Sequence, residues 1–466
     1  MALTDHPKAY GTAAVALSFT AGILITLGFK DFYPDLEQRY QRKRRSTAHR
    51  KGTNAPAEPS RRSSIFWGAP VKLEDHEAST QASHDDSSLR ALTSATRQAT
   101  DGTSDGIEAC IGNTPLIRIP SLSAATGRLI LAKAEFLNGA GNSPKDRVAL
   151  SIITAAESQG LLHPHQGDTI YEGTVGSTGI SLAALARAKG YKAHICMPDD
   201  QSFEKSDLLL HLGAEVERVP VQPITSPDHF VNLARRRARE HAGVKADGSK
   251  GFFADQFESP ANWQAHFNTT GPEIEAQTGG EVQAFVAGAG TGGTISGVAK
   301  YLKEQASLSS GSPLIILADP QGSGLYNKIR HGVMYSPTEK EGTRRRSQVD
   351  SIVEGVGINR VTQNLEEGRD LIDDAVKVTD EQACRMARWL VQKDGLFVGS
   401  SSAVNCVAAV EAAMRVPEGA TVVTVLCDPG TRHLSKFYKK IKEMGLEEEE
   451  AGDLFEDLGL AKVKET

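Results

Sequence analysis

From about residue 105 onward, short apolar runs alternate with segments whose apolar residues recur at helical spacing. The apolar runs include "DTIYEGT", "KAHICMP", "VQAFVAGAG" and "TVVTVLCDPG", and the helical patterns "GISLAALARAKG", "EKSDLLLHLG" and "TISGVAKYLKE" follow the first three. Strands that alternate with helices favour mostly parallel sheets with helices on both faces. The pattern therefore predicts an α/β fold.

The amino-terminal part of the chain has a different pattern. Residues 9–29 carry no charge, and as a helix they would be about 30 Å long, which is enough to cross a bilayer. We therefore predict that residues 1–45 form a membrane anchor, with a cleaved secretory signal as the less favoured alternative. Basic residues follow the apolar stretch as far as Arg45, which predicts that the bulk of the chain lies on the cytosolic side.

Two further segments lack the alternating pattern. Residues 46–104 are rich in Ser, Thr, Ala, Asp and Arg with little periodicity, so we expect a disordered linker. Residues 444–466 contain the acidic run "EEEEAGDLFEDLG", which predicts a solvated acidic tail.

Composition narrows the range of functions. A chain of 466 residues that is 39% hydrophobic can bury a large core. Its formal charge of -6 argues against a nucleic-acid partner. The five cysteines form no C-x-x-C pair and no H-E-x-x-H motif is present, so we expect neither a disulfide framework nor a metal site.

One predicted helix begins with a lysine. Ser143 is expected as its N-cap and Pro144 as its first residue, and Gly160 ends it. Lys145 then lies in the first turn, where the positive end of the helix dipole lowers the pKa of an ammonium group. Such a lysine suits a nucleophilic amine, whereas a surface lysine paired with Asp146 is the simpler interpretation of a lone residue.

Two other helix starts offer binding groups. The turn "YEGTVGSTGISLA" carries Thr174, Ser177 and Thr178, whose hydroxyls and neighbouring N–H groups suit a carboxylate. The segment "GAGTGGT" has the G-x-G-x-x-G spacing of a phosphate-binding loop. A dinucleotide would suit this loop if Asp319 contacted its ribose. A phosphorylated aldehyde cofactor also needs a lysine, which this chain supplies.

Eight segments in chain order carry a resemblance to a known family. They are "IGNTPLIRI", "SPKDR", "EGTVGSTGISLA", "DQFESPANWQAHFNTTGPEI", "GAGTGGTISG", "EGVGINRVTQNL", "GLFVGSSSAVN" and "LCDPGTRHLSKFY". Together they resemble the cysteine synthase and cystathionine β-synthase family of pyridoxal-phosphate enzymes. Within it, the likeness is nearest to fungal, mitochondrially associated cysteine synthase-like proteins with an amino-terminal apolar segment.

The resemblance implies a fold and a set of site residues. The fold is that of a fold-type II enzyme like the tryptophan synthase β subunit, in residues 105–443, with a smaller domain of about residues 145–260 inserted in a larger one. Lys145 would be the catalytic lysine that binds pyridoxal 5'-phosphate. The cofactor-binding residues that the resemblance implies are Lys145, Ser177, Gly290, Thr291, Gly292, Gly293, Thr294 and Ser401, and the implied substrate-binding residues are Thr174, Thr178 and Gln256.

The chain departs from the family pattern at several positions. Ser177 stands where Asn is usual, Val175 where Ser is usual and Ala403 where Gly is common. The loop before Lys145 is one residue longer than usual and ends with Pro144. These departures affect the groups expected around the cofactor ring and the substrate carboxylate.

The resemblance also implies an activity and a location. The activity is formation of L-cysteine from O-acetyl-L-serine and sulfide through an aminoacrylate intermediate, in a homodimer. The alternatives are a cystathionine β-synthase-like or other enzyme of β-substituted alanines, a catalytically impaired scaffold protein and an NAD-dependent dehydrogenase. The expected location is the mitochondrial outer membrane, held through residues 9–29 with the catalytic region facing the cytosol, or else another intracellular membrane.

Overall fold

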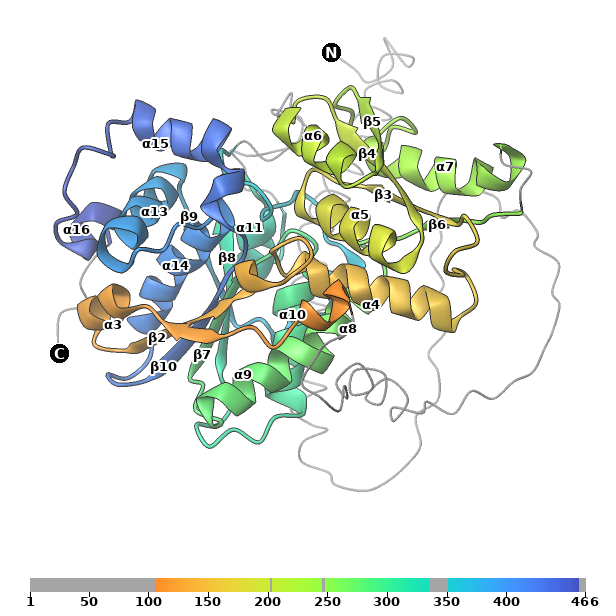
Figure 1. The fold of residues 1–466 in the computed structure, drawn as a ribbon. Helices are drawn as coiled ribbons and strands as arrows, with labels where there is room; N and C mark the ends of the chain where they lie inside the picture. Colours follow the sequence, from red (N-terminus) through yellow and green to blue (C-terminus); the bar gives the residue numbers. More distant parts are fainter. Residues whose placement is uncertain (1–105, 202, 245–247, 335–350, 461–466) are drawn as a thin grey trace, which may run out of the picture. The chain divides into compact units, whose positions relative to one another are not determined.

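The computed structural model describes residues 106–201, 203–244, 248–334 and 351–460. The predicted anchor and linker, residues 1–45 and 46–104, lie outside these ranges. Two sheets are built from the described residues (Figure 1). Their strands are β1 (Leu116–Arg118), β2 (Leu129–Ala134), β3 (Thr169–Gly173), β4 (Lys192–Pro198), β5 (Glu215–Val219), β6 (Gly251–Phe253), β7 (Ala284–Gly288), β8 (Leu314–Pro320), β9 (Asp374–Val378) and β10 (Thr421–Leu426).

Helices connect and cover these strands. The α-helices are α3 (Pro120–Thr126), α4 (Lys145–Ser158), α5 (Ser177–Lys189), α6 (Phe203–His211), α7 (Phe230–Val244), α8 (Ala261–Ala265), α9 (Gly271–Thr278), α10 (Gly293–Glu304), α11 (Leu325–His331), α12 (Gln363–Gly368), α13 (Asp380–Asp394), α14 (Ser400–Ala413), α15 (Lys439–Glu443) and α16 (Leu454–Leu458). Shorter 3-10 and π segments are η1 (Ile107–Cys110), η2 (Glu135–Leu137), η3 (His266–Thr270), η5 (Arg369–Leu371), η6 (Gly430–Arg432) and η7 (Leu434–Tyr438).

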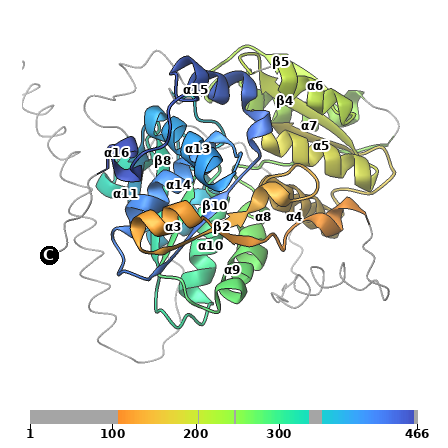
Figure 2. The ribbon, with the colours of Figure 1, turned by 60° about the vertical axis from the view of Figure 1, so that its left-hand side comes forward.

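The larger sheet has the strand order β1-β2-β10-β7-β8-β9. Only β1 is antiparallel to its neighbour, and the other strand pairs are parallel. Successive residues of β7 pack on opposite faces: Ala284 and Val286 join the core under α13 and α14, whereas Phe285 and Ala287 join the core under α10. Helices thus cover both faces of this sheet (Figure 2), which confirms the predicted α/β fold.

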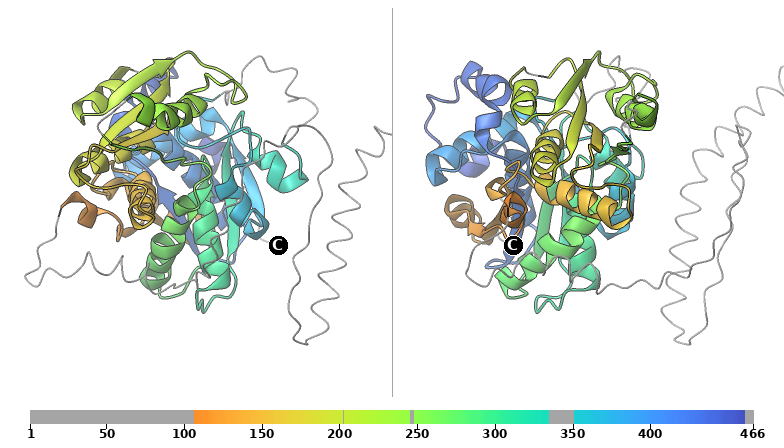
Figure 3. Two further views of the ribbon diagram at one scale, coloured as in Figure 1. Left: turned by 90° about the vertical axis from the view of Figure 1, so that its right-hand side faces the viewer. Right: turned by 45° about the vertical axis from the view of Figure 1, so that its right-hand side comes forward.

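The smaller sheet has the order β5-β4-β3-β6, and all its strands are parallel. One continuous stretch of chain forms it, between β2 and β7 of the larger sheet, and it is the yellow-to-green segment of Figure 3. Val148 of α4 and Ile180 of α5 pack against one face. Leu233 and Ala234 of α7 pack against the other.

In both sheets, helices start directly after the carboxyl ends of strands. α5 follows β3 after a short turn, and α10 follows β7 in the same way. Ligands in open parallel α/β sheets bind beyond the carboxyl ends of the strands, where such helix starts gather. The fold therefore brings the motifs at these two turns into the region where a ligand is expected.

The carboxyl-terminal segment differs from the expected solvated tail. The side chain of Asp453 caps α16 by accepting hydrogen bonds from the N–H groups of Phe455 and Glu456. Leu454, Phe455 and Leu458 are buried in the core under α13. Helical spacing of these apolar residues thus outweighs the acidic run before them, and the expectation of a wholly solvated tail is wrong for Leu454–Leu458.

Among the described residues, none of the helices has both the length and the apolar character that a membrane span requires.

Candidate active site

Lys145 is the first residue of α4, and Pro144 rather than Ser143 occupies the N-cap position. The predicted boundary was thus off by one residue. The Ser143 hydroxyl still accepts a hydrogen bond of 3.3 Å from the Lys145 N–H. The predicted position of the lysine in the first helical turn is confirmed.

The Lys145 side chain faces a cavity of about 620 Å³. Within the described residues, its Nζ makes no hydrogen bond and no ion pair with protein. Burial lowers the pKa of this amine, against the attraction of Cys427, Asp428 and Glu135. The alternative of a surface lysine paired with Asp146 is wrong, because Asp146 instead accepts hydrogen bonds from the Gly141 N–H at 2.7 Å and the Ser181 hydroxyl at 2.5 Å.

The turn between β3 and α5 forms a second wall of the cavity. Thr174 and Thr178 are 4% and 3% exposed and line it. The Thr178 hydroxyl donates a hydrogen bond of 2.6 Å to Gln256 Oε1, which ties the turn to the segment after β6. Ser177 begins α5 and also lines the cavity. The four predicted residues of the turn and the segment after β6 therefore lie together, although they are up to 82 positions apart in sequence.

The glycine loop between β7 and α10 forms a third wall. Gly290, Thr291, Gly292 and Thr294 line the cavity. A Cβ at Gly290 would lie 2.4 Å from the Gly355 oxygen, so only glycine allows the two backbones to approach so closely. Gly292 has φ +83°, which favours glycine for a second reason. The loop therefore leaves the first turn of α10 open to an anion.

Gly293 and Thr294 have supporting contacts behind the loop. Gly293 does not line the cavity, and a Cβ there would collide with Asn262 Oδ1 at 1.9 Å. Thr294 Oγ1 lies 3.2 Å from His266 Nε2, while His266 Nδ1 lies 2.9 Å from Thr270 Oγ1. Burial lowers the pKa of His266 to about 3, so the ring is neutral and joins two hydroxyls.

The three consecutive serines after Gly399 have different environments. The Ser400 hydroxyl accepts a hydrogen bond from the Glu354 N–H, and the Ser402 hydroxyl accepts one from the Cys427 N–H. Ser401 alone of the three lines the cavity, and it is 3% exposed. The structure thus places the predicted serine, and not its neighbours, at the cavity.

A carboxylate with a histidine partner beside these groups was not predicted from the sequence. Asp428 follows β10 and lines the cavity, and its Oδ2 lies 3.0 Å from His433 Nε2. Although burial opposes it, the attraction of His433 lowers the pKa of Asp428. A carboxylate thus stays ionised near Lys145. The signal was present in the "LCDPGTRH" segment, where an acidic residue directly follows a buried strand.

An ion pair at the cavity also escaped prediction. Lys205 of α6 lies 2.9 Å from Glu354, and Lys436 lies 3.4 Å from the same carboxylate. Lys205 belongs to the part of the chain that carries the smaller sheet, while Glu354 lies between β8 and β9 of the larger one. The pair therefore links the two parts across the cavity.

The alternative dinucleotide site fails on the position of Asp319. This residue is fully buried, accepts a hydrogen bond from the Tyr326 N–H and does not line the cavity. It therefore does not offer the ribose contact that a dinucleotide requires.

Comparisons with known proteins agree with this geometry. A family model described as "pyridoxal-phosphate dependent enzyme" matches residues 107–428. The chain is 65% identical to "cysteine synthase 2" of Neurospora crassa over all of both chains. It is 53% identical to a Saccharomyces cerevisiae protein provisionally named as a mitochondrial cysteine synthase, over 73% of this chain and 85% of that one. The crystal structure of O-ureido-L-serine synthase is similar with a TM-score of 0.62 and 30% identity, over 75% of this chain and 98% of that chain.

Proposed function

Because the chain belongs to the pyridoxal-phosphate dependent enzyme family, we propose that it is a cysteine synthase, a transferase that forms L-cysteine from O-acetyl-L-serine and sulfide. One observation carries the proposal. An amine that has no partner among the described residues, an open helix start and a set of buried hydroxyls face the same cavity. The near relative named cysteine synthase, at 65% identity, supports the choice of substrates.

The residues at the cavity fit pyridoxal 5'-phosphate. Lys145 would hold the aldehyde carbon covalently, and the loop from Gly290 to Thr294 would hold the phosphate at the start of α10. Ser401 would face the ring nitrogen, and Ser177 would contact the ring hydroxyl. When bound, this cofactor supplies an electron sink for the negative charge that develops at Cα of the amino acid.

The remaining work belongs to protein side chains. Thr174, Thr178 and Gln256 are proposed to bind the α-carboxylate, because their hydroxyl and amide groups lie at the start of α5. The Lys145 amine is proposed to take the proton from Cα, since its lowered pKa favours the neutral, basic form. Burial of these groups excludes water and strengthens each of these interactions.

Ser401 and Ser177 set the character of the reaction. A serine at the ring nitrogen offers a hydroxyl rather than a carboxylate, so it does not hold that nitrogen protonated. With an unprotonated ring nitrogen, the ring would take up less of the negative charge from Cα, so loss of the β-substituent would be favoured. Ser177 keeps a hydrogen-bonding group where the family usually has Asn. Its side chain is shorter than that of Asn, and both side chains are uncharged.

The proposal is tested by assay and by trapping on the purified protein. Cysteine formation from O-acetylserine and sulfide is measured, and the link between lysine and cofactor is reduced with borohydride and located by peptide mass spectrometry. We expect turnover and a single modified peptide that contains Lys145. A modified lysine elsewhere, or a loaded protein that O-acetylserine does not change spectroscopically, would contradict the proposal, and the second result would favour a scaffold protein.

A second candidate function uses the same residues with a larger thiol as acceptor, as in a cystathionine β-synthase-like enzyme. The observation in its favour is the apolar part of the cavity, where Leu208, Ile224 and Leu434 are 37%, 40% and 53% exposed. Sulfide needs no such surface. Comparison of kcat/KM for sulfide and for homocysteine distinguishes the two candidates.

We further propose that residues 9–29 anchor the protein in the mitochondrial outer membrane, with the catalytic region in the cytosol, and that the enzyme is a homodimer. The uncharged stretch and its basic flank support the anchor, and the provisional name of the yeast relative supports the organelle. Carbonate extraction and protease treatment of intact mitochondria test the location. Light scattering of the purified protein tests the dimer.

A further inference from the structure

A set of metal-binding side chains lies in the smaller sheet, away from the cavity. His194 and Cys196 are alternate residues of β4, so they point to the same face of the sheet. In the strand register, Cys196 is opposite Glu217 of β5 and His194 is opposite Glu215. Cys196 packs with Leu233 and Ala234, which places it under α7.

The three ligand atoms are close together. His194 Nε2 lies 3.2 Å from Glu217 Oε2, and Cys196 Sγ lies 3.9 Å from the same oxygen. All three atoms lie within 4.8 Å of one another. Zinc bonds of about 2.0–2.3 Å in a tetrahedron separate the ligand atoms by roughly 3.3–3.8 Å. The present spacing therefore matches a zinc site after small side-chain shifts.

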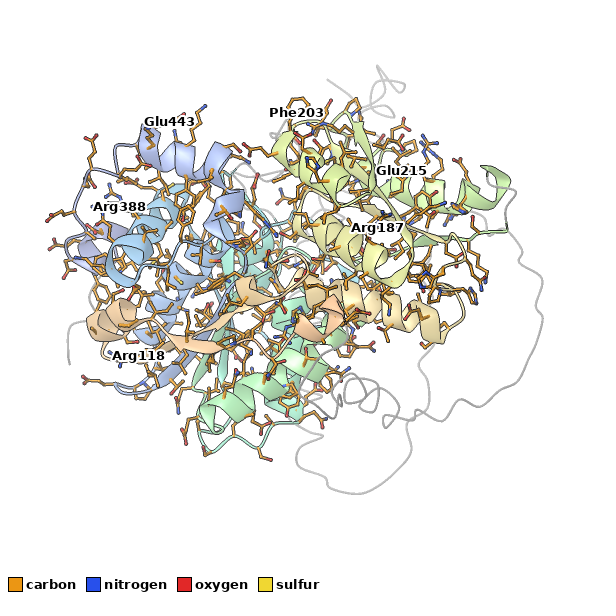
Figure 4. The ribbon with its side chains drawn as sticks, viewed as in Figure 1. Arg118, Arg187, Phe203, Glu215, Arg388 and Glu443 are labelled. Atoms are coloured by element: carbon orange, nitrogen blue, oxygen red, sulfur yellow. The ribbon has the colours of Figure 1, made fainter. Side chains whose placement is uncertain are left out.

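The surrounding residues already hold the ligands in position. The other ring nitrogen of His194, Nδ1, lies 3.1 Å from Glu215 Oε2. Glu215, labelled in Figure 4, begins β5. A histidine that ligates a metal usually donates its second N–H to a carboxylate in this way. The Tyr171 ring stacks on the imidazole with 5.0 Å between ring centroids, which further limits its rotation.

Glu217 is also fixed, by two hydrogen bonds from Arg237 of α7. Arg237 Nη2 donates to Oε1 at 2.8 Å and Nε donates to Oε2 at 3.1 Å. A carboxylate oxygen has a second lone pair for another partner. A Cys196 thiolate and the carboxylates of Glu215 and Glu217 are negatively charged. Together they would balance the positive charges of a divalent cation and of Arg237.

We propose that His194 Nε2, Cys196 Sγ and Glu217 Oε2 bind one divalent cation of the zinc class, with water as the fourth ligand. Imidazole with thiolate is the ligand combination that favours zinc over magnesium or calcium. None of the three residues lines the cavity, so this site is independent of the proposed synthase activity. Its effect is to join β4 and β5 to each other beneath α7.

The site was not expected from the sequence, because its ligands do not form a closely spaced motif. Here the ligands are an H-x-C pair on one strand and a single glutamate 21 positions after Cys196. Only the register of two strands brings them together. The competing interpretation is a hydrogen-bond network without metal, in which a protonated His194 lies between Glu215 and Glu217.

The test uses the full-length, cofactor-loaded protein. It is treated with a chelator, mixed with zinc chloride, and passed through gel filtration before elemental analysis and zinc X-ray absorption spectroscopy. We expect one zinc per chain, with one sulfur neighbour near about 2.3 Å and the remaining neighbours at about 2.0–2.1 Å. No retained zinc, or a spectrum without sulfur, would overturn the proposal.

Two variants and a control locate the ion. Cys196→Ser is expected to lose the sulfur neighbour and to bind zinc at least tenfold more weakly. Glu215→Gln is expected to weaken binding by about 10–100-fold through the orientation of His194, and its side chain is exposed enough to spare the fold if Cys196→Ser does not fold. Cys110→Ser is the control, because Cys110 is an exposed cysteine elsewhere. Equal zinc binding by wild type and both variants, with loss in the control, would assign the ion to Cys110 and refute the site.

Discussion

Two helices, α4 and α10, begin at the same cavity and use that position in opposite ways. α10 begins with Gly293 after Gly292, so no charged side chain fills the space before its first turn. α4 begins with Lys145, a cation at the positive end of a helix dipole. The first arrangement leaves the dipole to a ligand anion. The second makes the charged form of an amine less stable.

The difference shows that a helix start has no single function. In α4, Asp146 follows the lysine and accepts hydrogen bonds from the Ala140 and Gly141 N–H groups of the loop before it, so it holds that loop and leaves the lysine free for a ligand. No carboxylate lies in the first turn of α10. The residues at each helix start therefore indicate which ligand group binds there. A substitution at one start should impair the binding or the chemistry at that start alone.

The largest effect is expected from removing the amine at the start of α4. Lys145→Ala removes both the covalent attachment and the proposed acceptor of the Cα proton, so kcat/KM for cysteine formation should fall by about 10²–10⁴-fold. Steady-state assays measure it. Lys192→Ala is the control, since Lys192 is exposed on β4. Activity within about threefold of wild type in Lys145→Ala would refute the role of this lysine.

The next effect concerns the start of α10. Gly292→Ala places a Cβ 2.5 Å from the Leu365 Cβ and 2.7 Å from its Cα, at φ +83°. The loop must then shift, and we expect cofactor affinity to fall by about 10–100-fold, because a misplaced helix start loses hydrogen bonds to a charged group. Equilibrium dialysis with pyridoxal phosphate measures it.

Gly279→Ala is the matched control for this substitution. Gly279 also has positive φ, +63°, but a Cβ there would meet nothing within 4 Å. Gly279→Ala therefore carries the backbone cost of an L residue in the left-handed region, roughly 1–2 kcal/mol, without the collision. Unchanged affinity in Gly292→Ala, or an equal loss in both variants, would show that close packing of the loop does not form the phosphate site.

The sequence predicted these two helix starts for a physical reason. Each is a local feature, in which the residues just before the helix and in its first turn carry both the start signal and the chemistry. Lys145 and the loop of Gly290 to Thr294 are of this kind. Helix start signals also carry an error of a residue or so, which explains why Pro144 and not Ser143 is the N-cap.

What escaped prediction depends on contacts between distant segments. His266 supports Thr294 from 28 positions away, and Glu354 meets Lys205 from 149 positions away. No local pattern records such pairs. Burial of Leu454–Leu458 likewise depends on α13, which lies far earlier in the chain. The resemblance implied Ser401, but the contact that turns its neighbour away also joins distant segments, since the Cys427 N–H donates a hydrogen bond to the Ser402 hydroxyl.

A smaller effect is expected at the start of α5. This helix start presents neutral hydroxyl groups, whereas α4 presents a lysine and α10 presents glycines. Thr178→Val removes the hydroxyl that hydrogen-bonds Gln256 at 2.6 Å. Loss of a hydrogen bond to a carboxylate corresponds to about 10-fold or somewhat more, so KM for O-acetylserine should rise by about that factor. Initial-rate kinetics measure it.

The control is Thr169→Val, in which the buried hydroxyl has no hydrogen-bond partner among the described residues. Thr169 lies at the start of β3 and not at the cavity. Its KM should match that of the wild type. If Thr178→Val also matched, the carboxylate would have to bind elsewhere, and α5 would serve only to support the cavity.

The smallest effect concerns the carboxyl group of Glu172, just before the same turn. It is fully buried, and it accepts hydrogen bonds from the N–H groups of Gly173 at 3.0 Å and Gln256 at 3.2 Å. Burial raises the pKa of Glu172 to about 8, against the lowering effect of these bonds. Between its unfolded pKa near 4.3 and about pH 8, the folded protein therefore binds a proton that the unfolded chain does not.

Stability must then fall as pH rises through this range, because the folded state binds more protons than the unfolded one. The slope from this group is at most about 1.4 kcal/mol per pH unit. Glu172→Gln replaces the carboxyl group with an amide that does not titrate, so this contribution to the slope is lost. The free energy of unfolding, measured in urea, should therefore decline less between pH 5.5 and 8 than in the wild type. Glu448→Gln, on an exposed residue, should follow the wild type. Parallel pH profiles for all three proteins would mean that Glu172 is ionised in the folded state throughout, and that the turn before α5 holds a negative charge beside the proposed carboxylate site.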